Sequence, residues 1–350
     1  MISKSLFRIV LINLLIFIFL YLILEILTGT LIFKNKLDCH YLSCDRTYVY
    51  QNDLTKNEKV IFNKDKYGFR GLRKNVDKID LLVVGGSTTE QHFLNLNDTW
   101  PELIEKKFRE NSQNIDIVNA GIGGQSTVGH VWNFDNWFGK IKNFKTKYII
   151  FYLGINDIKE NIYENITSYD HGKIKARNTI DRLIIFLKDN NGVTYKLVKF
   201  FYNKLYLKNV EIIKYEVKNK NDYKEVKKKF NLTKKHKKYL MNNLNEILRL
   251  TNDIKAIPIF ITQKSFRGNM VDFNLVSVDG FDYYHAEKEV AETIINFCRN
   301  NDIFCIDLFN KIEFEYNDFY DLIHTTKKGA KKIAEVIFSE LNNNKIQILN

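Results

Sequence analysis

The chain has 350 residues, 45% of them hydrophobic and 27% charged, so it can build a packed core and is not globally disordered. Its net charge of +12 suits an acidic polymer, an anionic lipid or nucleic acid, or simply keeps the chain soluble. No zinc-finger, RNP-type or basic-zipper pattern occurs, so we expect no nucleic-acid partner.

The N-terminus carries an uncharged apolar run from Ile9 to Leu24, with Lys4 and Arg8 before it and Glu25 after it. A helix needs about 20 such residues to cross a bilayer. Because no A-x-A-like cleavage site follows, we predict an uncleaved, single-pass signal anchor over residues 1–33, in the cell inner (plasma) membrane. The positive residues place the N-terminus in the cytoplasm and the catalytic part outside. A buried hydrophobic helix is the alternative.

The four cysteines fall into two pairs. Cys39 and Cys44 follow the anchor, where an exported chain meets an oxidising compartment, so a small disulfide loop is expected. A metal site with His40 would lack a fourth ligand. Cys298 and Cys305 fall in helix and strand patterns, and we interpret them as buried free thiols.

Residues 34–79 form a polar juxtamembrane region without a long period, and Lys66 to Gly71 within it are typical of a structured turn. Short apolar runs then predict buried strands, and a three- and four-residue repeat from Ala330 to Leu341 predicts a final helix. Alternating strands and helices indicate a doubly wound α/β sandwich with a parallel sheet. The five predicted strands lie at 81–84, 115–118, 148–153, 257–262 and 303–308.

A long insertion, residues 159–250, separates a first part of the domain, 80–158, from a second part, 251–343. It contains helical patterns and a dense group of lysines from Lys224 to Lys238. The insertion is either a lid over the strand ends or a solvated helical hairpin, since a basic face is usually just solvated.

Four motifs follow predicted strands. Gly85-Gly86-Ser87-Thr88 presents a serine at a helix N-terminus, where free N–H groups stabilise negative charge. A glycine-rich turn spans Asn119 to Ser126, and Gly154-Ile155-Asn156-Asp157 carries an amide that can donate to an oxyanion. Asp321-Leu322-Ile323-His324 pairs a carboxylate with an imidazole that can take a serine proton.

Together these motifs resemble the SGNH (GDSL-type) hydrolase family, in its membrane-anchored bacterial branch, over residues 66–343. The resemblance implies a three-layer α/β/α, flavodoxin-like sandwich with a five-stranded parallel sheet. It also implies a Ser87, Asp321 and His324 triad and an oxyanion hole made by Ser87, Gly124 and Asn156. Gly121 and Gly123 are alternatives to Gly124. The family's usual aspartate before the serine is replaced by Gly86, and that aspartate is not a triad member.

The function that follows is a serine esterase acting on O-acyl esters, foremost O-acetyl esters, of an extracytoplasmic glycan or another ester substrate. The glycan is implied by the anchored branch of the family and not by individual residues. An O-acetyltransferase of a cell-surface polysaccharide would use the same site. A non-catalytic, membrane-tethered glycan-binding module is a further alternative. We expect no metal and no cofactor.

Other ionisable side chains compete for these roles. His92 and His130 follow the first and second motifs, and we interpret both as structural or surface residues. His285 is a weaker rival base, for which we expect no spaced aspartate. Glu90 is either a pocket acid or a residue that stabilises the start of its helix.

Overall fold

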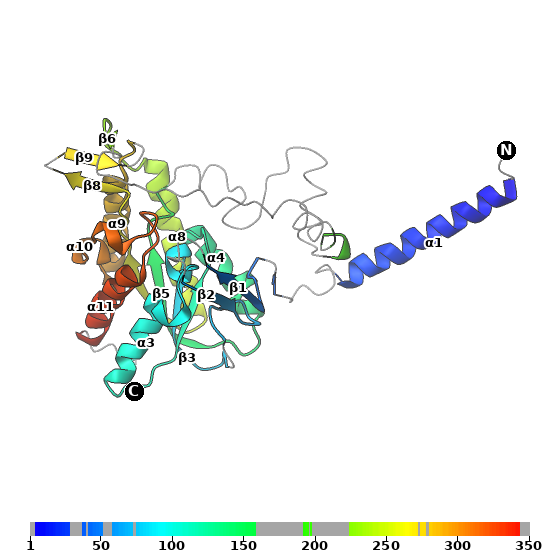
Figure 1. Ribbon diagram of the computed structural model, residues 1–350, viewed down its shortest axis with the longest axis horizontal. Helices are drawn as coiled ribbons and strands as arrows, with labels where there is room; N and C mark the ends of the chain where they lie inside the picture. Colours follow the sequence, from blue (N-terminus) through cyan, green and yellow to red (C-terminus); the bar gives the residue numbers. More distant parts are fainter. Residues whose placement is uncertain are drawn as a thin grey trace. The chain divides into compact units, whose positions relative to one another are not determined.

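The computed structural model divides the chain into two compact units, residues 1–36 with 173–213 and residues 37–172 with 214–350 (Figure 1). The residues that the structure describes are 4–28, 37–39, 41–51, 58–72, 75–158, 192–195, 197, 224–271, 274–277 and 280–343.

The first unit contains helix α1, Lys4–Thr28. Within it, Phe7–Leu27 is 21 residues long and apolar enough to cross a membrane, as a signal sequence would also be. Near its end, the carboxylate of Glu25 accepts hydrogen bonds of 2.9 and 3.0 Å from the backbone N–H and hydroxyl of Thr194. Most of the helical patterns predicted in the insertion lie outside the described residues.

The second unit is built on a five-stranded sheet in the order β10-β7-β5-β3-β4, with every neighbouring pair parallel. This order is the flavodoxin-like one, and it confirms the predicted fold class and the five strands. The last strand ends earlier than predicted, because the Asp307 side chain caps the short helix that follows. The strands are β3 (Ile79–Gly85), β4 (Ile117–Gly121), β5 (Thr146–Leu153), β7 (Ile257–Thr262) and β10 (Phe304–Ile306).

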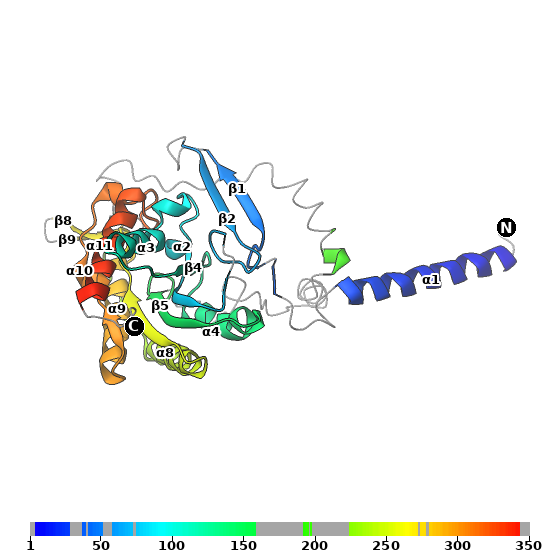
Figure 2. The same cartoon turned by 90° about the horizontal axis from the view of Figure 1, so that it is seen from below.

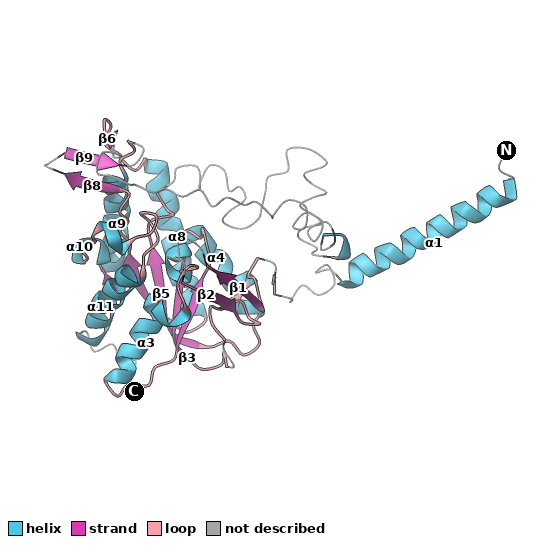
Figure 3. Cartoon of the chain, in the orientation of Figure 1, coloured by secondary structure: helices cyan, strands magenta, loops and turns pink. Residues whose placement is uncertain are grey.

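Helices cover both faces of this sheet (Figures 1 and 3). Strand residues alternate between two cores: Leu81 and Val83 pack with α3 (Trp100–Glu110) and α11 (Lys327–Asn343) on one face. On the other face, Leu82 and Val84 belong to the core that contains α4 (Thr127–Asn136), α8 (Lys234–Asp253) and α9 (Tyr283–Asn300). Burial on both faces explains why the strands are continuous apolar runs.

Part of the predicted insertion belongs to the group of helices that includes α4 and α9 and covers one face of the sheet. Helix α8 places Leu240, Leu244 and Ile247 in the core beside the sheet. Its lysines lie on the opposite, exposed side of the helix, as expected for an amphipathic helix. The remaining domain limits drawn from the sequence stay predictions.

The juxtamembrane region contains a hairpin that the sequence did not predict. Strands β1 (Arg46–Tyr50) and β2 (Val60–Lys64) pair antiparallel (Figure 2). The turn predicted at Lys66 to Gly71 follows β2, with left-handed φ values of 89° at Gly68 and 94° at Gly71.

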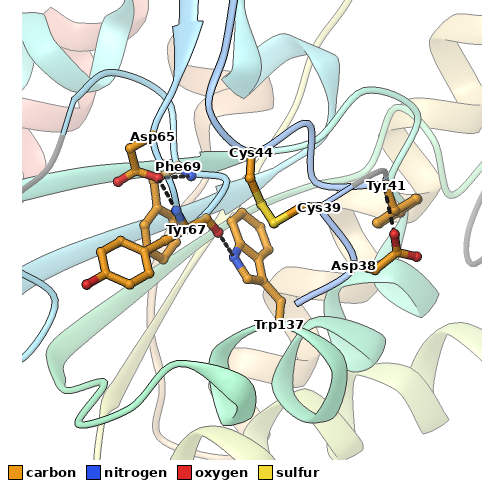
Figure 4. Close-up of a disulfide and its surroundings, with 8 residues drawn as sticks. All are labelled: Asp38, Cys39, Tyr41, Cys44, Asp65, Tyr67, Phe69 and Trp137. Carbon is orange, nitrogen blue, oxygen red and sulfur yellow. Dashed lines mark hydrogen bonds between the residues drawn. A yellow bond between two sulfur atoms is a disulfide. The ribbon is translucent and has the colours of Figure 1, made fainter. Parts of the chain in front are cut away.

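A disulfide joins Cys39 to Cys44, as expected, and packs against this turn (Figure 4). Beside it, the Trp137 indole donates a 2.6 Å hydrogen bond to the carbonyl of Tyr67. The disulfide closes a short loop and so fixes the segment before the hairpin onto the core.

The prediction for the other two cysteines was wrong: Cys298 and Cys305 form a second disulfide. The end of α9 and the start of β10 bring their Cα atoms to 6.2 Å, a separation that a disulfide can span.

A small antiparallel sheet completes the unit, in the order β6-β9-β8. The remaining short elements are β6 (Lys224–Glu225), β8 (Gly268–Val271), β9 (Asn274–Ser277), α2 (Ser87–Glu90), α10 (Leu308–Lys311), η2 (Leu96–Asp98), η3 (Phe138–Lys140) and η6 (Tyr316–Asp318).

Candidate active site

Ser87 is the first residue of helix α2, directly after strand β3 and two glycines. Asn156 follows the neighbouring strand β5. The strand order reverses between β3 and β5, and open α/β sheets bind ligands at such a switch point. The first and third motifs therefore flank the place where a site is expected.

The fourth motif meets the first although the two are far apart in sequence. The His324 Nε2 atom lies 2.7 Å from Ser87 Oγ, and His324 Nδ1 lies 2.6 Å from Asp321 Oδ2. Because a carboxylate only accepts, Nδ1 carries the proton and Nε2 accepts the hydrogen bond from the serine hydroxyl. The structure thus brings Ser87, His324 and Asp321 into one hydrogen-bonded chain.

The loop that carries Asp321 and His324 is fixed by its own backbone. Asp321 Oδ1 accepts hydrogen bonds of 3.2 and 2.8 Å from the N–H groups of Ile323 and His324. Burial would raise the pKa of Asp321, but the hydrogen bonds from His324 and Ile323 outweigh it, and the pKa is lowered. Asp321 is therefore ionised at neutral pH and can orient the imidazole.

A second link joins this loop to the serine turn. The Gln91 amide, just after α2, donates a 2.9 Å hydrogen bond to Thr325 Oγ1. Gln91 Oε1 accepts from the N–H of Trp100 at 2.7 Å. Both polar ends of this buried side chain are therefore hydrogen-bonded, and the bond to Thr325 joins the loop of His324 to the turn that carries Ser87.

The second motif offers three glycines, and hydrogen bonding distinguishes them. The N–H of Gly121 donates to Asn119 Oδ1 at 2.9 Å, and the N–H of Gly123 donates to Glu90 Oε2 at 3.0 Å. Among the described residues, the N–H groups of Gly124 and Ser87 have no protein acceptor. Gly124 also has a left-handed φ of 80°, which suits glycine. Only Gly124 of the three can offer its N–H to a substrate oxygen.

Asn156 lies beside these donors. Its Nδ2 atom donates a 2.8 Å hydrogen bond to the carbonyl of Gln125, which leaves the second amide hydrogen for a ligand. A Cβ atom at Gly86 would lie 2.6 Å from Asn156 Nδ2 and 3.0 Å from that same carbonyl. The glycine that replaces the family's aspartate therefore makes room for the amide.

This crowding gives a prediction. We expect Gly86→Ala to lower kcat/KM for a small ester by at least about tenfold, because the methyl group would displace the amide of Asn156, the predicted oxyanion donor. Steady-state kinetics, with circular dichroism to confirm folding, test it. A folded Gly86→Ala variant with wild-type activity would show that the amide does not act from this position.

A buried ion pair supports the glycine loop. Lys64, at the end of the hairpin, lies 2.8 Å from Glu90 Oε1, and both side chains are almost fully buried. Lys64 Nζ also donates to the Gly121 carbonyl at 3.2 Å, while Glu90 binds the Gly123 N–H. The pair therefore connects helix α2 to both ends of the turn before Gly124.

The charge of Lys64 is the largest influence that lowers the pKa of Glu90. Burial would raise the pKa of Glu90, but the charge of Lys64 and the nearby His92 ring, whose Nδ1 lies 3.9 Å from Glu90 Oε2, lower it to about 2. His92 in turn forms a hydrogen bond with the Tyr50 hydroxyl and stacks on Phe62, with ring centroids 3.9 Å apart. Glu90 and His92 are thus parts of the support of the site.

The remaining rival histidines are placed elsewhere. His130 is buried on α4 near Phe151, at a centroid distance of 6.3 Å. The expectation that His285 lacks an aspartate was wrong, since its Nδ1 lies 2.8 Å from Asp282 Oδ2. That aspartate caps helix α9, which explains the contact without a catalytic role.

Sequence reasoning missed the supporting residues Lys64, Gln91, Asn119 and Thr325. Of these four, only Asn119 was part of a sequence motif, as the first residue of the second one. Its side-chain amide donates a 2.8 Å hydrogen bond to the Thr89 carbonyl. Among the described residues, no group of three or more His, Cys, Asp or Glu side chains has the arrangement of a metal site.

Comparison with known proteins now decides the family. The sequence model of the GDSL-like lipase/acylhydrolase family matches residues 83–332. The chain belongs to this family. It is therefore an ester-bond hydrolase, as the resemblance implied. The match begins after the hairpin, so Lys64 lies outside it. No curated protein sequence matches the chain.

Solved structures of GDSL-type proteins are similar to this family member. One is a lipolytic G-D-S-L protein from Veillonella parvula (15% identity, 75% of this chain and 97% of that one, TM-score 0.42). The esterase EstA of Pseudoalteromonas has 11% identity, coverage of 76% and 97%, and a TM-score of 0.43. A variant of the acetyl xylan esterase Axe2 of Geobacillus stearothermophilus has 13% identity, coverage of 75% and 94%, and a TM-score of 0.43.

Proposed function

We propose that this GDSL-family hydrolase is a serine esterase that removes O-acyl groups, foremost acetyl, from an extracytoplasmic glycan. The observation that carries the proposal is the hydrogen-bonded chain from Ser87 through His324 to Asp321, at 2.7 and 2.6 Å. The free N–H groups of Ser87 and Gly124 and the Asn156 amide support an oxyanion hole beside it.

The chemistry proceeds in two acyl transfers. His324 Nε2 takes the hydroxyl proton as Ser87 Oγ attacks the ester carbonyl carbon, and the three donors stabilise the oxyanion. The tetrahedral intermediate expels the sugar oxygen, which takes the proton from His324. Water, deprotonated by the same imidazole, then attacks the acyl-serine and releases the carboxylic acid and free Ser87.

The location outside the cytoplasm is part of the proposal. Helix α1 is long enough to span a bilayer, and Lys4 and Arg8 near its start favour a cytoplasmic N-terminus. Two disulfides in the second unit suit an oxidising compartment. A single-pass anchor in the inner (plasma) membrane would then hold the catalytic unit close to envelope glycans.

The test follows the fate of the acyl group. The purified protein is incubated with an acetylated polysaccharide and a non-acetylated acceptor glycan, and free acetate and acetylated acceptor are both measured. We expect acetate release that the Ser87→Ala variant lacks. Acetyl groups on the acceptor instead of in water would identify an O-acetyltransferase, and neither product would leave the non-catalytic glycan-binding alternative.

A further inference from the structure

A cavity lies in the catalytic unit, away from the triad, and is formed by the segments that precede helices α8 and α9. The cavity has a volume of about 360 Å³ and is lined by residues 228–231, Thr233, His236 and residues 280–282. The Phe230 N–H donates a 2.9 Å hydrogen bond to Asp282 Oδ2 and joins the two segments. The volume falls within the usual range of small-ligand pockets.

The lining combines aromatic faces with positive charge. Phe230 and Phe281 lie with ring centroids 5.5 Å apart, and Phe281 is 40% exposed although it is a large apolar side chain. Lys228 and Lys229 also line the cavity. Within the described part of the chain, neither lysine forms an ion pair, so both charges are available to a ligand.

Asp282, the acidic residue in the lining, already has hydrogen-bond partners within the protein. Asp282 is buried, and its carboxylate accepts hydrogen bonds from the Phe230 and His285 N–H groups and from the His285 ring. Lys228 and Lys229 therefore give the cavity a positive rim.

A direct contact places this cavity at the same edge of the sheet as Ser87. His236 lines the cavity, and its Nε2 atom lies 2.7 Å from the carbonyl oxygen of Asp157. Asp157 follows Asn156, the proposed oxyanion donor. The cavity is thus connected through two residues to the reaction centre.

We propose that this cavity binds a carboxylate-bearing sugar unit, so that the substrate of the esterase is an acidic polysaccharide. The inference rests on the proposed function and names its substrate class. The phenylalanine faces can pack against the C–H faces of a pyranose ring, and the two ammonium groups can pair with its carboxylate. Asn231 and Thr233, also in the lining, can hydrogen-bond to its hydroxyl groups.

Binding is tested first, without turnover. The full-length protein in detergent is titrated with polygalacturonate and with neutral xylan, by calorimetry at low ionic strength. We expect binding to the acidic polymer only. We also expect the Lys228→Ala/Lys229→Ala double variant to bind about tenfold more weakly, since each lost contact weakens binding a few-fold. Phe281→Ala should weaken it as well, with little change in salt dependence.

A matched control removes the same charge elsewhere. Lys106→Ala/Lys331→Ala changes exposed lysines on α3 and α11, on another face of the unit, and should leave the affinity unchanged. Equal weakening by both double variants would overturn the proposal in favour of general electrostatic attraction. Binding of phosphatidylglycerol vesicles that depends on Lys228 and Lys229, without polygalacturonate binding, would overturn it in favour of a lipid surface.

Kinetics then separate this inference from the proposed function. On acetylated polygalacturonate the lysine double variant should show a KM about tenfold higher, whereas kcat/KM for a small acetyl ester should not change. Wild-type polymer binding without any ester turnover would refute the esterase and keep the cavity assignment. Ester turnover with no lysine-dependent binding would refute the cavity assignment and keep the esterase.

Discussion

Alanine in place of Ser87 is expected to lower kcat for a small acetyl ester by about 10⁴-fold or more, with His324→Ala producing a loss of similar size. Without Oγ there is no nucleophile, and without Nε2 the serine proton has no acceptor at 2.7 Å. The two losses should not add in the double variant, because both residues act in one step. Steady-state kinetics with acid–base titration of the released acid measure them.

The chain contains its own control for this prediction. Asp282 and His285 have the same spacing as Asp321 and His324 and a similar contact, 2.8 Å against 2.6 Å. His285→Ala should leave kcat/KM for the small ester within about twofold, since no step of the mechanism uses that ring. If His285→Ala inactivated the folded enzyme and His324→Ala did not, the assignment of the base would be wrong.

The parts of the fold that were predictable are those with a strong local pattern. The strands β3, β5 and β7 are buried on both faces and therefore read as unbroken apolar runs. The first three motifs lie at the ends of β3, β4 and β5, so a parallel sheet places them at one edge, whereas Asp321 and His324 come after α10 and η6. The pairing of Ser87 with His324 followed from this topology and from family resemblance.

The hairpin was not predictable for a physical reason. In β1 the residues alternate between half-buried and exposed, and Val49 and Ile61 are apolar but 56% and 44% exposed. The pattern therefore lacks the polar and apolar alternation of a strand with one solvated face. The register of the hairpin and the position of Lys64 depend on contacts with α2. These residues are too far apart in the sequence to form a local pattern.

The Cys298–Cys305 disulfide was missed for a related reason. The helix and strand patterns around the two cysteines were correct, but each was interpreted alone. Their pairing depends on how tightly the chain turns between α9 and β10, since the Cα separation of 6.2 Å is a tertiary property. Spacing in the sequence does not determine it.

Lys64→Met is expected to lower kcat for the small ester by about 10²-fold, with a much smaller change in KM, because a misplacement of about 1 Å in the glycine loop that carries Gly124 has an effect of this size. The change removes the 2.8 Å ion pair to Glu90 and the hydrogen bond to the Gly121 carbonyl. Lys59→Met, at an exposed position just before the same strand, is the matched control and should retain wild-type kcat.

The same variant should be destabilised by about 3–5 kcal/mol near neutral pH, since Glu90 would remain as a buried charge without its partner. The dependence on pH follows from the lowered pKa of Glu90, about 2 against an ordinary value of 4.5. A carboxylate with a lowered pKa stabilises the folded state fully above its unfolded pKa, and this contribution is lost as the pH falls through the folded one. In urea titrations, the stability difference between wild type and Lys64→Met should therefore shrink as the pH falls to about 2, and the decrease should begin above pH 4.5, because burial raises the pKa of Glu90 once Lys64 is removed.

Glu90→Gln tests the effect of the carboxylate charge separately from that of its hydrogen bond to the Gly123 N–H. Glutamine can still accept the Gly123 N–H, which Glu90 Oε2 binds at 3.0 Å, but it cannot neutralise Lys64. We expect Glu90→Gln to retain more of kcat than Lys64→Met, while its stability no longer carries the acid-dependent component between pH 4.5 and 2. If Lys64→Met lost stability but kept wild-type kcat, the ion pair would serve folding alone, and the glycine loop would hold the Gly124 N–H in place without it.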